Sequence, residues 1–137
     1  MKFYSPKGPS LKSICNKLKP ECFLQDMLDR GMIEEITDDY SSDVYHLCNN
    51  AVAWMLLQLA STYYYYEVVV VKGSFNGKDH SWLKVGNFIF DLTLAQFIEC
   101  PRLAITKTSD DIGYEPYAEM TVDEYKLHLF AENNLTY

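Results

Sequence analysis

The sequence predicts an α+β fold: N-terminal helices, a central buried helix, an antiparallel meander of three to four strands and a last helix. The first observation is residues 47–60, an almost uninterrupted apolar segment of helical length, which is typical of a buried helix. The second is the alternation of apolar and polar residues on both sides of Gly86-Asn87, the pattern of a hairpin with a two-residue loop. The third is Asn76-Gly77, a strong hairpin signal.

The composition is that of a globular protein with an acidic surface. The chain has 137 residues, of which 48% are hydrophobic and 23% are charged, and its net charge is −7. This length predicts a single domain over residues 1–137 with a core of its own. The acidity disfavours a nucleic-acid partner, because proteins that bind a phosphate backbone gather Lys and Arg on one face.

The thiols and the hydropathy of the chain predict a reducing compartment. The four cysteines form no C-x-x-C pair and are too sparse for a disulfide scaffold; they are Cys15, Cys22, Cys48 and Cys100. Cys15 and Cys22 fall in apolar helical stripes, which predicts that both are buried. No secretory pattern opens the sequence, and the most apolar run, residues 51–60, is about half the length of a membrane span. We therefore expect a cytoplasmic protein, or one delivered into a host cell without a recognisable signal peptide, and no membrane partner.

The N-terminal part of the chain predicts two short helices and a connector. The first helix is expected to begin after a cap at Ser10 and to end before Pro20. The second is expected over residues 21–30, with Gly31 as its C-terminal cap. The acidic residues 34–43 lack the regular oxygen spacing of a calcium loop, so we expect a solvated connector there.

The central helix is expected from about Val44 to Ser61, with Cys48 near its N-terminus. The positive end of a helix dipole favours a thiolate and lowers the pKa of a cysteine, but the effect decays beyond the first turn. A helix that begins at Val44 would place Cys48 in its second turn. The position of the cap, for which residues 41–43 are candidates, therefore decides how strongly the dipole acts on this thiol.

The meander follows the central helix. A strand is expected over residues 63–71, where tyrosines are followed by valines. The Asn76-Gly77 loop then sets Gly73 opposite His80, and this glycine either leaves space beside the imidazole or marks a bulge.

Beyond the second hairpin the pattern weakens. We expect a short helix within residues 93–99, a fourth strand over 103–106 and an acidic loop over 109–120. Thr121 and Glu124 then have the spacing of a capping box, which predicts the start of the last helix.

The hairpin around Gly86-Asn87 brings a histidine and a carboxylate together. Side chains two positions apart share a face of a strand, so the hairpin has one mostly apolar face and one polar face. The apolar face carries Ser81, Leu83, Val85, Phe88, Phe90 and Leu92, and the polar face carries His80, Trp82, Lys84, Ile89, Asp91 and Thr93. His80 and Asp91 become diagonal cross-strand neighbours with Cβ atoms about 7–8 Å apart, a gap that the two side chains can close. A carboxylate that orients a histidine is half of a nucleophilic triad, and Cys48 is the candidate nucleophile.

These residues resemble a known superfamily. The helix-borne Cys48, followed by His80-Ser81-Trp82 and Asp91-Leu92-Thr93 on adjacent strands, resembles the transglutaminase-like branch of the papain-like cysteine enzymes. That branch includes arylamine N-acetyltransferases and bacterial effectors that deamidate glutamine. The resemblance covers about residues 44–97 and implies a papain-like core with a Cys-His-Asp triad. The papain-type pattern also has a glutamine shortly before the cysteine, and none stands here.

The oxyanion donor is therefore open at this point. One candidate is the backbone N–H of Cys48, provided that the helix start leaves it free. The side-chain candidates for oxyanion or substrate binding are Asn49, Asn50, Trp82 and Gln96.

The function that these residues predict is cysteine-dependent acyl transfer through a thioester intermediate, with a protein or peptide as substrate. Amide hydrolysis of the glutamine deamidase or protease type is the expected outcome, and cross-linking or acyl transfer to an amine would use the same groups. We expect neither a cofactor nor a metal.

Other interpretations of the same residues stay open. Cys48 can be a core thiol beside a structural His80–Asp91 pair, or the triad can be present in form and inactive. A zinc site from these residues and His46 has no supporting ligand spacing. The competing class is a non-catalytic acidic interaction protein or inhibitor that occupies a basic groove of a partner, or an immunity or assembly subunit. His46 and His128 are expected at the surface.

Overall fold

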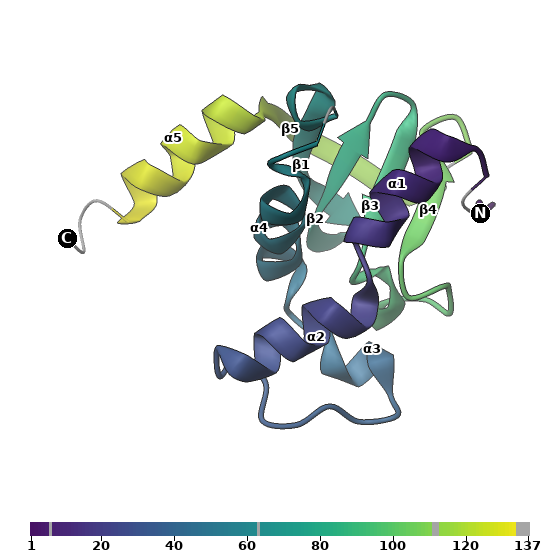
Figure 1. Ribbon diagram of the computed structural model, residues 1–137, viewed down its shortest axis with the longest axis vertical. Helices are drawn as coiled ribbons and strands as arrows, with labels where there is room; N and C mark the ends of the chain where they lie inside the picture. Colours follow the sequence, from purple (N-terminus) through teal and green to yellow (C-terminus); the bar gives the residue numbers. More distant parts are fainter. Residues whose placement is uncertain (6, 63, 111–112, 134–137) are drawn as a thin grey trace.

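The computed structural model describes residues 1–5, 7–62, 64–110 and 113–133, with side chains described up to Leu129 in the last helix. The helices are α1 (Pro9–Lys17), α2 (Pro20–Asp29), α3 (Tyr40–Asp43), α4 (Cys48–Leu59) and α5 (Val122–Asn133), and the 3₁₀ turns are η1 (Tyr65–Glu67) and η2 (Leu94–Gln96). The strands are β1 (Val68–Phe75), β2 (Lys78–Val85), β3 (Phe88–Asp91), β4 (Ala104–Lys107) and β5 (Tyr114–Thr121). The fold is α+β, as the sequence predicts (Figure 1).

The described strands form one antiparallel sheet in the order β4-β3-β2-β1-β5. Both predicted hairpin registers are confirmed: Phe75 pairs with Lys78, and Val85 pairs with Phe88. The fourth strand is also confirmed and pairs with β3. Two-residue loops therefore set the register of β1 with β2 and of β2 with β3, whereas a longer connection joins β3 to β4 and β5 pairs with β1, which is distant in the sequence.

The sheet separates two clusters of buried side chains. Helices α1 and α4 cover one face, where Leu83 and Phe90 pack against the central helix (Figure 1). The opposite face carries Trp82 and Ile89 and is covered by the segment around η2 and by the N-terminal residues. The alternation of the two faces predicted for this hairpin is therefore confirmed.

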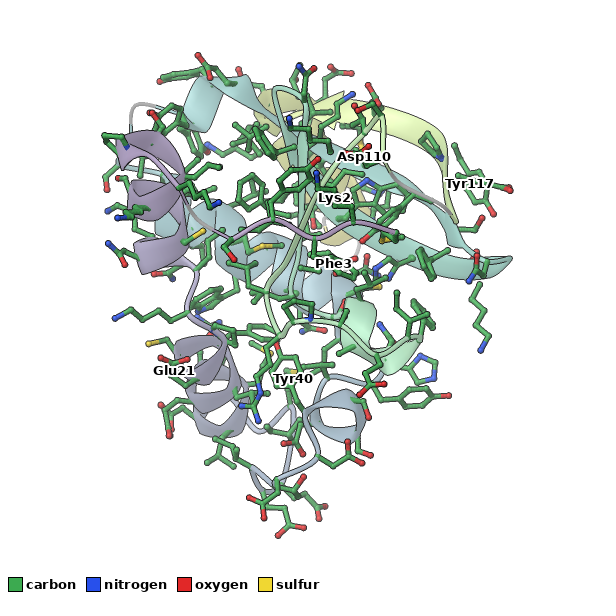
Figure 2. The ribbon with its side chains drawn as sticks, turned by 90° about the vertical axis from the view of Figure 1, so that its right-hand side faces the viewer. Lys2, Phe3, Glu21, Tyr40, Asp110 and Tyr117 are labelled. Carbon is green, nitrogen blue, oxygen red and sulfur yellow. The ribbon has the colours of Figure 1, made fainter. Side chains whose placement is uncertain are left out.

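The N-terminal segment is held against β4. The backbone N–H of Tyr4 donates to the carbonyl of Ile105, and the hydroxyl of Thr106 donates to the carbonyl of Lys2. Figure 2 shows Lys2 and Phe3 on this segment as it runs across the sheet. Phe3 packs against the cluster that contains Trp82, so the segment expected to be an irregular lead-in closes one face of the sheet.

Four predictions about the N-terminal helices need correction. Helix α1 begins at Pro9 with Gly8 as its N-cap, so Ser10 lies inside the helix, because proline is favoured in a first turn that needs no N–H. The side chain of Cys22 is exposed and that of Cys15 is half-buried, so neither is the buried thiol expected.

The acidic connector also contains a helix, α3. Its Asp43 is buried, where it accepts hydrogen bonds from the backbone and hydroxyl of Thr37.

The strand expected over residues 63–71 starts later than predicted. Tyr63 lies outside the described residues, Tyr64 precedes η1, and Tyr65 and Tyr66 belong to it, with Tyr66 at the surface (89% exposed). The strand itself begins at Val68. A run of aromatic residues is compatible with several backbone conformations. Of the residues 63–71 expected as a strand, the valines 68–71 are in the sheet.

The acidic loop expected over residues 109–120 is in its second part an edge strand, β5, paired with β1. The register shifts between Lys72 and Gly73, which is the bulge that the sequence left open. A Cβ atom at Gly73 would lie 2.2 Å from the carbonyl oxygen of Glu115, so only glycine allows β5 to approach this closely. The sequence does not indicate this strand, because β5 contains Pro116 and mostly exposed side chains. Both are tolerated at a sheet edge, where a strand needs no alternating apolar pattern.

The last helix starts at the predicted capping box. The N–H of Glu124 donates to the hydroxyl of Thr121, and the N–H of Thr121 donates to the carboxylate of Glu124. Helix α5 packs against the body through Val122 and Tyr125 and then extends away from the sheet (Figure 1). Among the helices that the structure describes, none combines the length and the apolar character needed to cross a membrane.

Candidate active site

Cys48 is the first residue of α4. The helix does not begin at Val44 as expected, because α3 ends at Asp43 and a turn separates the two helices. His46 in this turn has a φ of 61°, in the left-handed region, so the chain cannot continue as one helix through it. The thiol therefore lies in the first turn of a buried helix, where the dipole favours its ionised form.

His80 and Asp91 form a buried pair. Nε2 of His80 lies 2.6 Å from Oδ2 of Asp91, and the two side chains are 0% and 1% exposed. This contact, which the hairpin register predicts, is confirmed. Asp91 also accepts hydrogen bonds from the backbone N–H of Thr93 at 2.9 Å and from the hydroxyl of Tyr114 at 2.8 Å. The carboxylate is thus held from three sides, which stabilises its charge in a buried place.

Aromatic side chains enclose the imidazole of His80. The ring of Phe97 meets it edge-on with centroids 5.0 Å apart, and the ring of Trp82 lies 5.8 Å away. Tyr114 packs against Trp82 at 4.6 Å. These rings limit the orientations of His80 and exclude water from its contact with Asp91, which strengthens the electrostatic interaction of the pair.

Cys48 meets His80 where β2 and β3 separate. The pairing of these strands stops at Leu83 and Phe90, although β2 continues back to Lys78. The backbone N–H of Ser81, beyond the last paired position, donates toward the Cys48 sulfur. Nδ1 of His80 is buried, and apart from the contact of the ring with the Cys48 thiol it has no hydrogen-bond partner in the described part of the chain. Because Nε2 is bound to Asp91, Nδ1 is the ring nitrogen that can exchange a proton with the thiol.

The environment favours the charged forms of both groups. Burial would raise the pKa of Cys48, but hydrogen bonding and charge from His80, together with the Ser81 N–H, lower this pKa below its ordinary value. Burial would lower the pKa of His80, but the charge of Asp91, its hydrogen bond and the neighbouring thiol raise this pKa to about 9. Both shifts favour a thiolate–imidazolium pair near neutral pH.

The other cysteines differ from Cys48. Burial and the nearby Asp91 carboxylate raise the pKa of Cys100 to about 12. Burial also raises the pKa of Cys15, and Cys22 is an exposed thiol on α2. Cys48 is therefore the candidate for an activated thiol, and the other cysteines are internal references for its reactivity.

Three of the side-chain candidates for the oxyanion donor, Asn49, Asn50 and Trp82, contact other parts of the fold. The carbonyl oxygen of the Asn49 side chain accepts hydrogen bonds from Ser81 at 2.9 Å and from Lys72 at 2.7 Å, which ties α4 to the sheet. Asn50 lines a hollow toward α2 together with Trp54. Trp82 is buried against the rings of His80 and Tyr114. The contacts of Asn49 and Trp82 give these two side chains structural roles, and Asn50 faces the hollow near α2.

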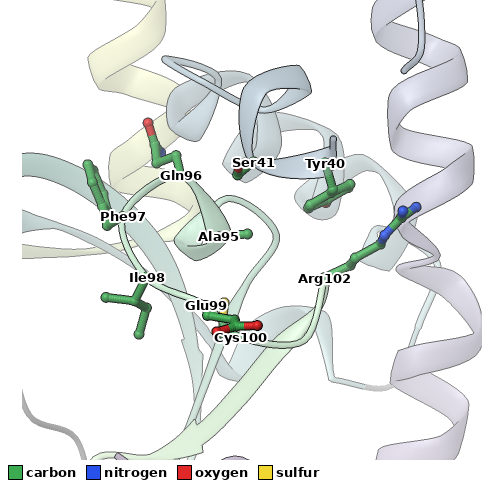
Figure 3. A pocket seen from close by; sticks show the side chains of 9 residues that line it. All are labelled: Tyr40, Ser41, Ala95, Gln96, Phe97, Ile98, Glu99, Cys100 and Arg102. Atoms are coloured by element: carbon green, nitrogen blue, oxygen red, sulfur yellow. The ribbon is translucent and has the colours of Figure 1, made fainter. Parts of the chain in front are cut away.

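Gln96 differs from the other candidates because its amide contacts the segment before Cys48. Its Oε1 accepts a hydrogen bond of 3.1 Å from the backbone N–H of His46, and its Nε2 is buried without a partner among the described residues. Gln96 and Phe97 stand at one side of a hollow of about 420 Å³, across from Tyr40 and Arg102 (Figure 3). Cys48, His80 and Asp91 do not line this hollow, which lies beyond Gln96 and Phe97.

Sequence reasoning missed two groups of this site, Tyr114 and the backbone N–H of Ser81. Tyr114 stands in the strand that was expected to be a loop, and an edge strand with Pro116 gives little periodic signal. His46 and His128 are exposed, as expected. Within the described residues, no three or more His, Cys, Asp or Glu side chains are grouped as metal ligands.

The chain matches no protein-family model, no curated protein and no solved structure. The geometry of the site is therefore the basis on which a function is inferred.

Proposed function

We propose that this protein is a cysteine-dependent acyl-transfer enzyme in which Cys48 is the nucleophile, His80 transfers protons and Asp91 orients His80. The observation that carries this proposal is the position of Cys48 in the first turn of α4, beside a buried histidine that is bound to a carboxylate through its other nitrogen. A purely structural His–Asp pair would need no thiol with a lowered pKa at its free nitrogen.

The reaction follows from these positions. The thiolate of Cys48 attacks an amide carbonyl and forms a carbon–sulfur bond, and the π electron pair moves to the carbonyl oxygen. When the tetrahedral intermediate collapses, the imidazolium of His80 gives its proton to the leaving nitrogen, and a thioester and an amine or ammonia result. His80 then takes a proton from water, whose oxygen attacks the thioester and releases the acid and the thiolate. An amine in place of water would give transfer or cross-linking.

The substrate class that we propose is a glutamine side chain or backbone amide of a protein or peptide. Cys48 is half-buried, so part of its side chain reaches the surface. The hollow of about 420 Å³ lined by Gln96 and Phe97 suits a side chain and its neighbours better than a large cofactor-bound donor. All four cysteines are free thiols, so we also propose a reducing compartment such as the cytoplasm.

The competing class, an acidic interaction protein, has weaker support. Several acids of residues 34–43 are exposed, as a docking surface would need. Two of them, however, serve the fold: Asp39 caps α3, and Asp43 is buried against Thr37. These roles explain part of the acidic run without a partner.

Alkylation tests the proposal. Iodoacetamide is added to the native protein across pH 5–9, and the modification of each cysteine is followed by mass spectrometry. We expect Cys48 to react fastest below pH 7 and to lose this advantage in His80→Ala, because the thiolate depends on the imidazolium. Cys22 is the exposed reference, and Cys15 and Cys100 are references with raised pKa. If Cys48 reacts no faster than Cys22 in the native protein, the proposed function is wrong.

A further inference from the structure

The amide of Gln96 is held at the N-terminal end of α4. Its Oε1 lies 3.1 Å from the backbone nitrogen of His46, two residues before Cys48. The N–H groups of a helix's first turn point out of this end and have no acceptor within the helix. The first intrahelical bond here runs from Ala51 to the carbonyl of Leu47, so the N–H of Cys48 is one of these unused donors.

The orientation of the amide follows from its partner. The His46 N–H is a donor, so it must face the oxygen of the Gln96 side chain and not its NH₂ group. Nε2 is therefore on the other arm of the amide, where it is buried and has no acceptor among the described residues. Buried NH₂ groups without a partner are rare in folded proteins, and each is explained by strain, by a bound water or ion, or by a catalytic role.

The turn before the helix is shaped for this contact. His46 has a φ of 61°, a conformation that L-residues adopt at a cost unless surrounding contacts hold it. The hydrogen bond from its N–H to Gln96 is one of these contacts. The segment η2, which carries Gln96, directly follows Asp91 and Thr93, so the same strand end that holds the triad carboxylate also delivers the amide.

We infer that Nε2 of Gln96 and the backbone N–H of Cys48 form the oxyanion hole, and that the substrate is consequently an acyl compound with a planar carbonyl. This inference rests on the proposed function. When the Cys48 sulfur bonds to the carbonyl carbon, the π electron pair moves onto the oxygen, and the two N–H groups bind the resulting O⁻. When the carbon–sulfur adduct collapses, that pair returns to the carbonyl and the leaving group departs with the proton of His80.

This assignment separates acyl transfer from other thiol chemistry. A thiol used for disulfide exchange or peroxide reduction needs an activated thiolate but no donors for a developing oxyanion. An amide nitrogen kept free beside the helix end, in addition to the activated thiol, favours attack at a carbonyl. It also replaces the upstream glutamine of the papain-type pattern with a residue that lies after the histidine and the carboxylate in the chain.

Two reagents distinguish the thiolate from the oxyanion hole. Iodoacetamide alkylates Cys48 by displacement of iodide at a saturated carbon, a reaction that forms no oxyanion. p-Nitrophenyl acetate acylates Cys48 through a tetrahedral oxyanion and releases p-nitrophenolate, which is followed by its absorbance. Both rates are measured across pH 5–9 and divided by the fraction of Cys48 that is ionised at each pH. A change in the Cys48 pKa then does not affect the comparison of the two rates.

The decisive variants are Gln96→Glu and Gln96→Ala. Gln96→Glu keeps an oxygen for the His46 N–H and removes the NH₂ donor, so it tests the donor in a nearly unchanged shape, and Gln96→Ala removes both without adding a charge. We expect acylation by p-nitrophenyl acetate to fall by about 100- to 1,000-fold in each, and alkylation by iodoacetamide to stay within about threefold of the native rate. Gln25→Ala, an exposed glutamine on α2 that contacts Asp29, is the matched control and should change neither rate.

The other outcomes contradict the inference in distinguishable ways. If both reagents react at native rates in the Gln96 variants, or if both rates fall by the same factor, Gln96 does not bind an oxyanion, although the thiolate–imidazolium pair can still exist. If Cys48 of the native protein reacts slowly with both reagents, the proposed function itself is wrong and the oxyanion hole is excluded with it. Thermal unfolding of each variant shows that the fold is kept, and Gln96→Glu decides if Gln96→Ala does not fold.

Discussion

The hydroxyl of Tyr114 donates a hydrogen bond of 2.8 Å to Oδ2 of Asp91, the same oxygen that contacts His80. The two residues are far apart in the sequence, and the bond joins the edge strand β5 to the end of β3 across the buried face of the sheet. One carboxylate oxygen thus accepts from an imidazole and a phenol at once. The edge strand is therefore part of the support of the candidate site.

The variant Tyr114→Phe tests this support. It removes one donor from a buried carboxylate while it keeps the ring that packs on Trp82, so we expect a loss of about 1–3 kcal/mol in the free energy of unfolding. Urea denaturation measures the change. Tyr117→Phe is the matched control on the same strand, because the side chain of Tyr117 is 69% exposed, and its effect should stay within about 0.5 kcal/mol. Equal effects of the two substitutions would show that the bond to Asp91 contributes nothing.

The His80–Asp91 pair makes stability depend on pH. The pKa of His80 is raised from 6.5 to about 9, so between these pH values the native protein holds a proton that the unfolded chain has lost. Stability from this pair is therefore complete below pH 6.5 and is lost as the pH rises through about 9, by roughly 3 kcal/mol in total. Urea denaturation across pH 6–10 measures it.

This pH experiment is best done in Cys48→Ala. The pKa of Cys48 is lowered, so its ionisation contributes with the opposite sign and would mask part of the slope. The double variant Cys48→Ala with Asp91→Asn serves as the control, because without the carboxylate the burial of His80 lowers its pKa and the loss of stability in this window should disappear. A flat profile in Cys48→Ala alone would contradict the raised pKa.

Gly73 should tolerate no side chain. A methyl group there would lie 2.2 Å from the carbonyl oxygen of Glu115, a backbone atom that can move only if β5 moves. We expect Gly73→Ala to destabilise the protein by about 2 kcal/mol or more and to weaken the contact of Tyr114 with the carboxylate. Gly86→Ala is the comparison: Gly86 has open space but a φ of 58°, so its cost should be only about 1 kcal/mol. The reverse order would mean that the bulge adapts freely.

The capping box of α5 should stabilise the start of that helix. Thr121→Ala removes the acceptor for the N–H of Glu124 and should cost about 0.5–2 kcal/mol, seen as faster amide hydrogen exchange in the first turns of α5. Thr121→Ser keeps the hydroxyl and should exchange like the native protein. Unchanged exchange in Thr121→Ala would show that packing of Tyr125 alone holds the helix.

The sequence was sufficient to predict contacts between residues that a short turn or a helix start brings together. The two-residue loop at Gly86-Asn87 and the period of two along a strand bring His80 next to Asp91, and both the register and the contact are present. The capping box is equally local, because a hydroxyl and a carboxylate three residues apart can each reach only the backbone of the other. Neither prediction needs knowledge of distant segments.

The start of the central helix could not be predicted in the same way. Residues 44–47 are compatible with helix, and an apolar run gives no sign of where it is interrupted. The break at His46 depends on the contact between its N–H and Gln96. Gln96 follows both hairpins in the sequence and is therefore distant from His46 along the chain. That contact, and the placement of Cys48 in the first turn, come from packing and not from propensity.

By itself, the sequence determined the α+β class, the hairpins and the pair of His80 with Asp91, because turn chemistry and side-chain alternation act between near neighbours. Only the tertiary structure decided that β5 closes the sheet, that Tyr114 supports the carboxylate and that the amide of Gln96 faces the start of α4. These contacts join segments that are far apart in the chain, and their formation depends on how whole elements pack rather than on any short pattern.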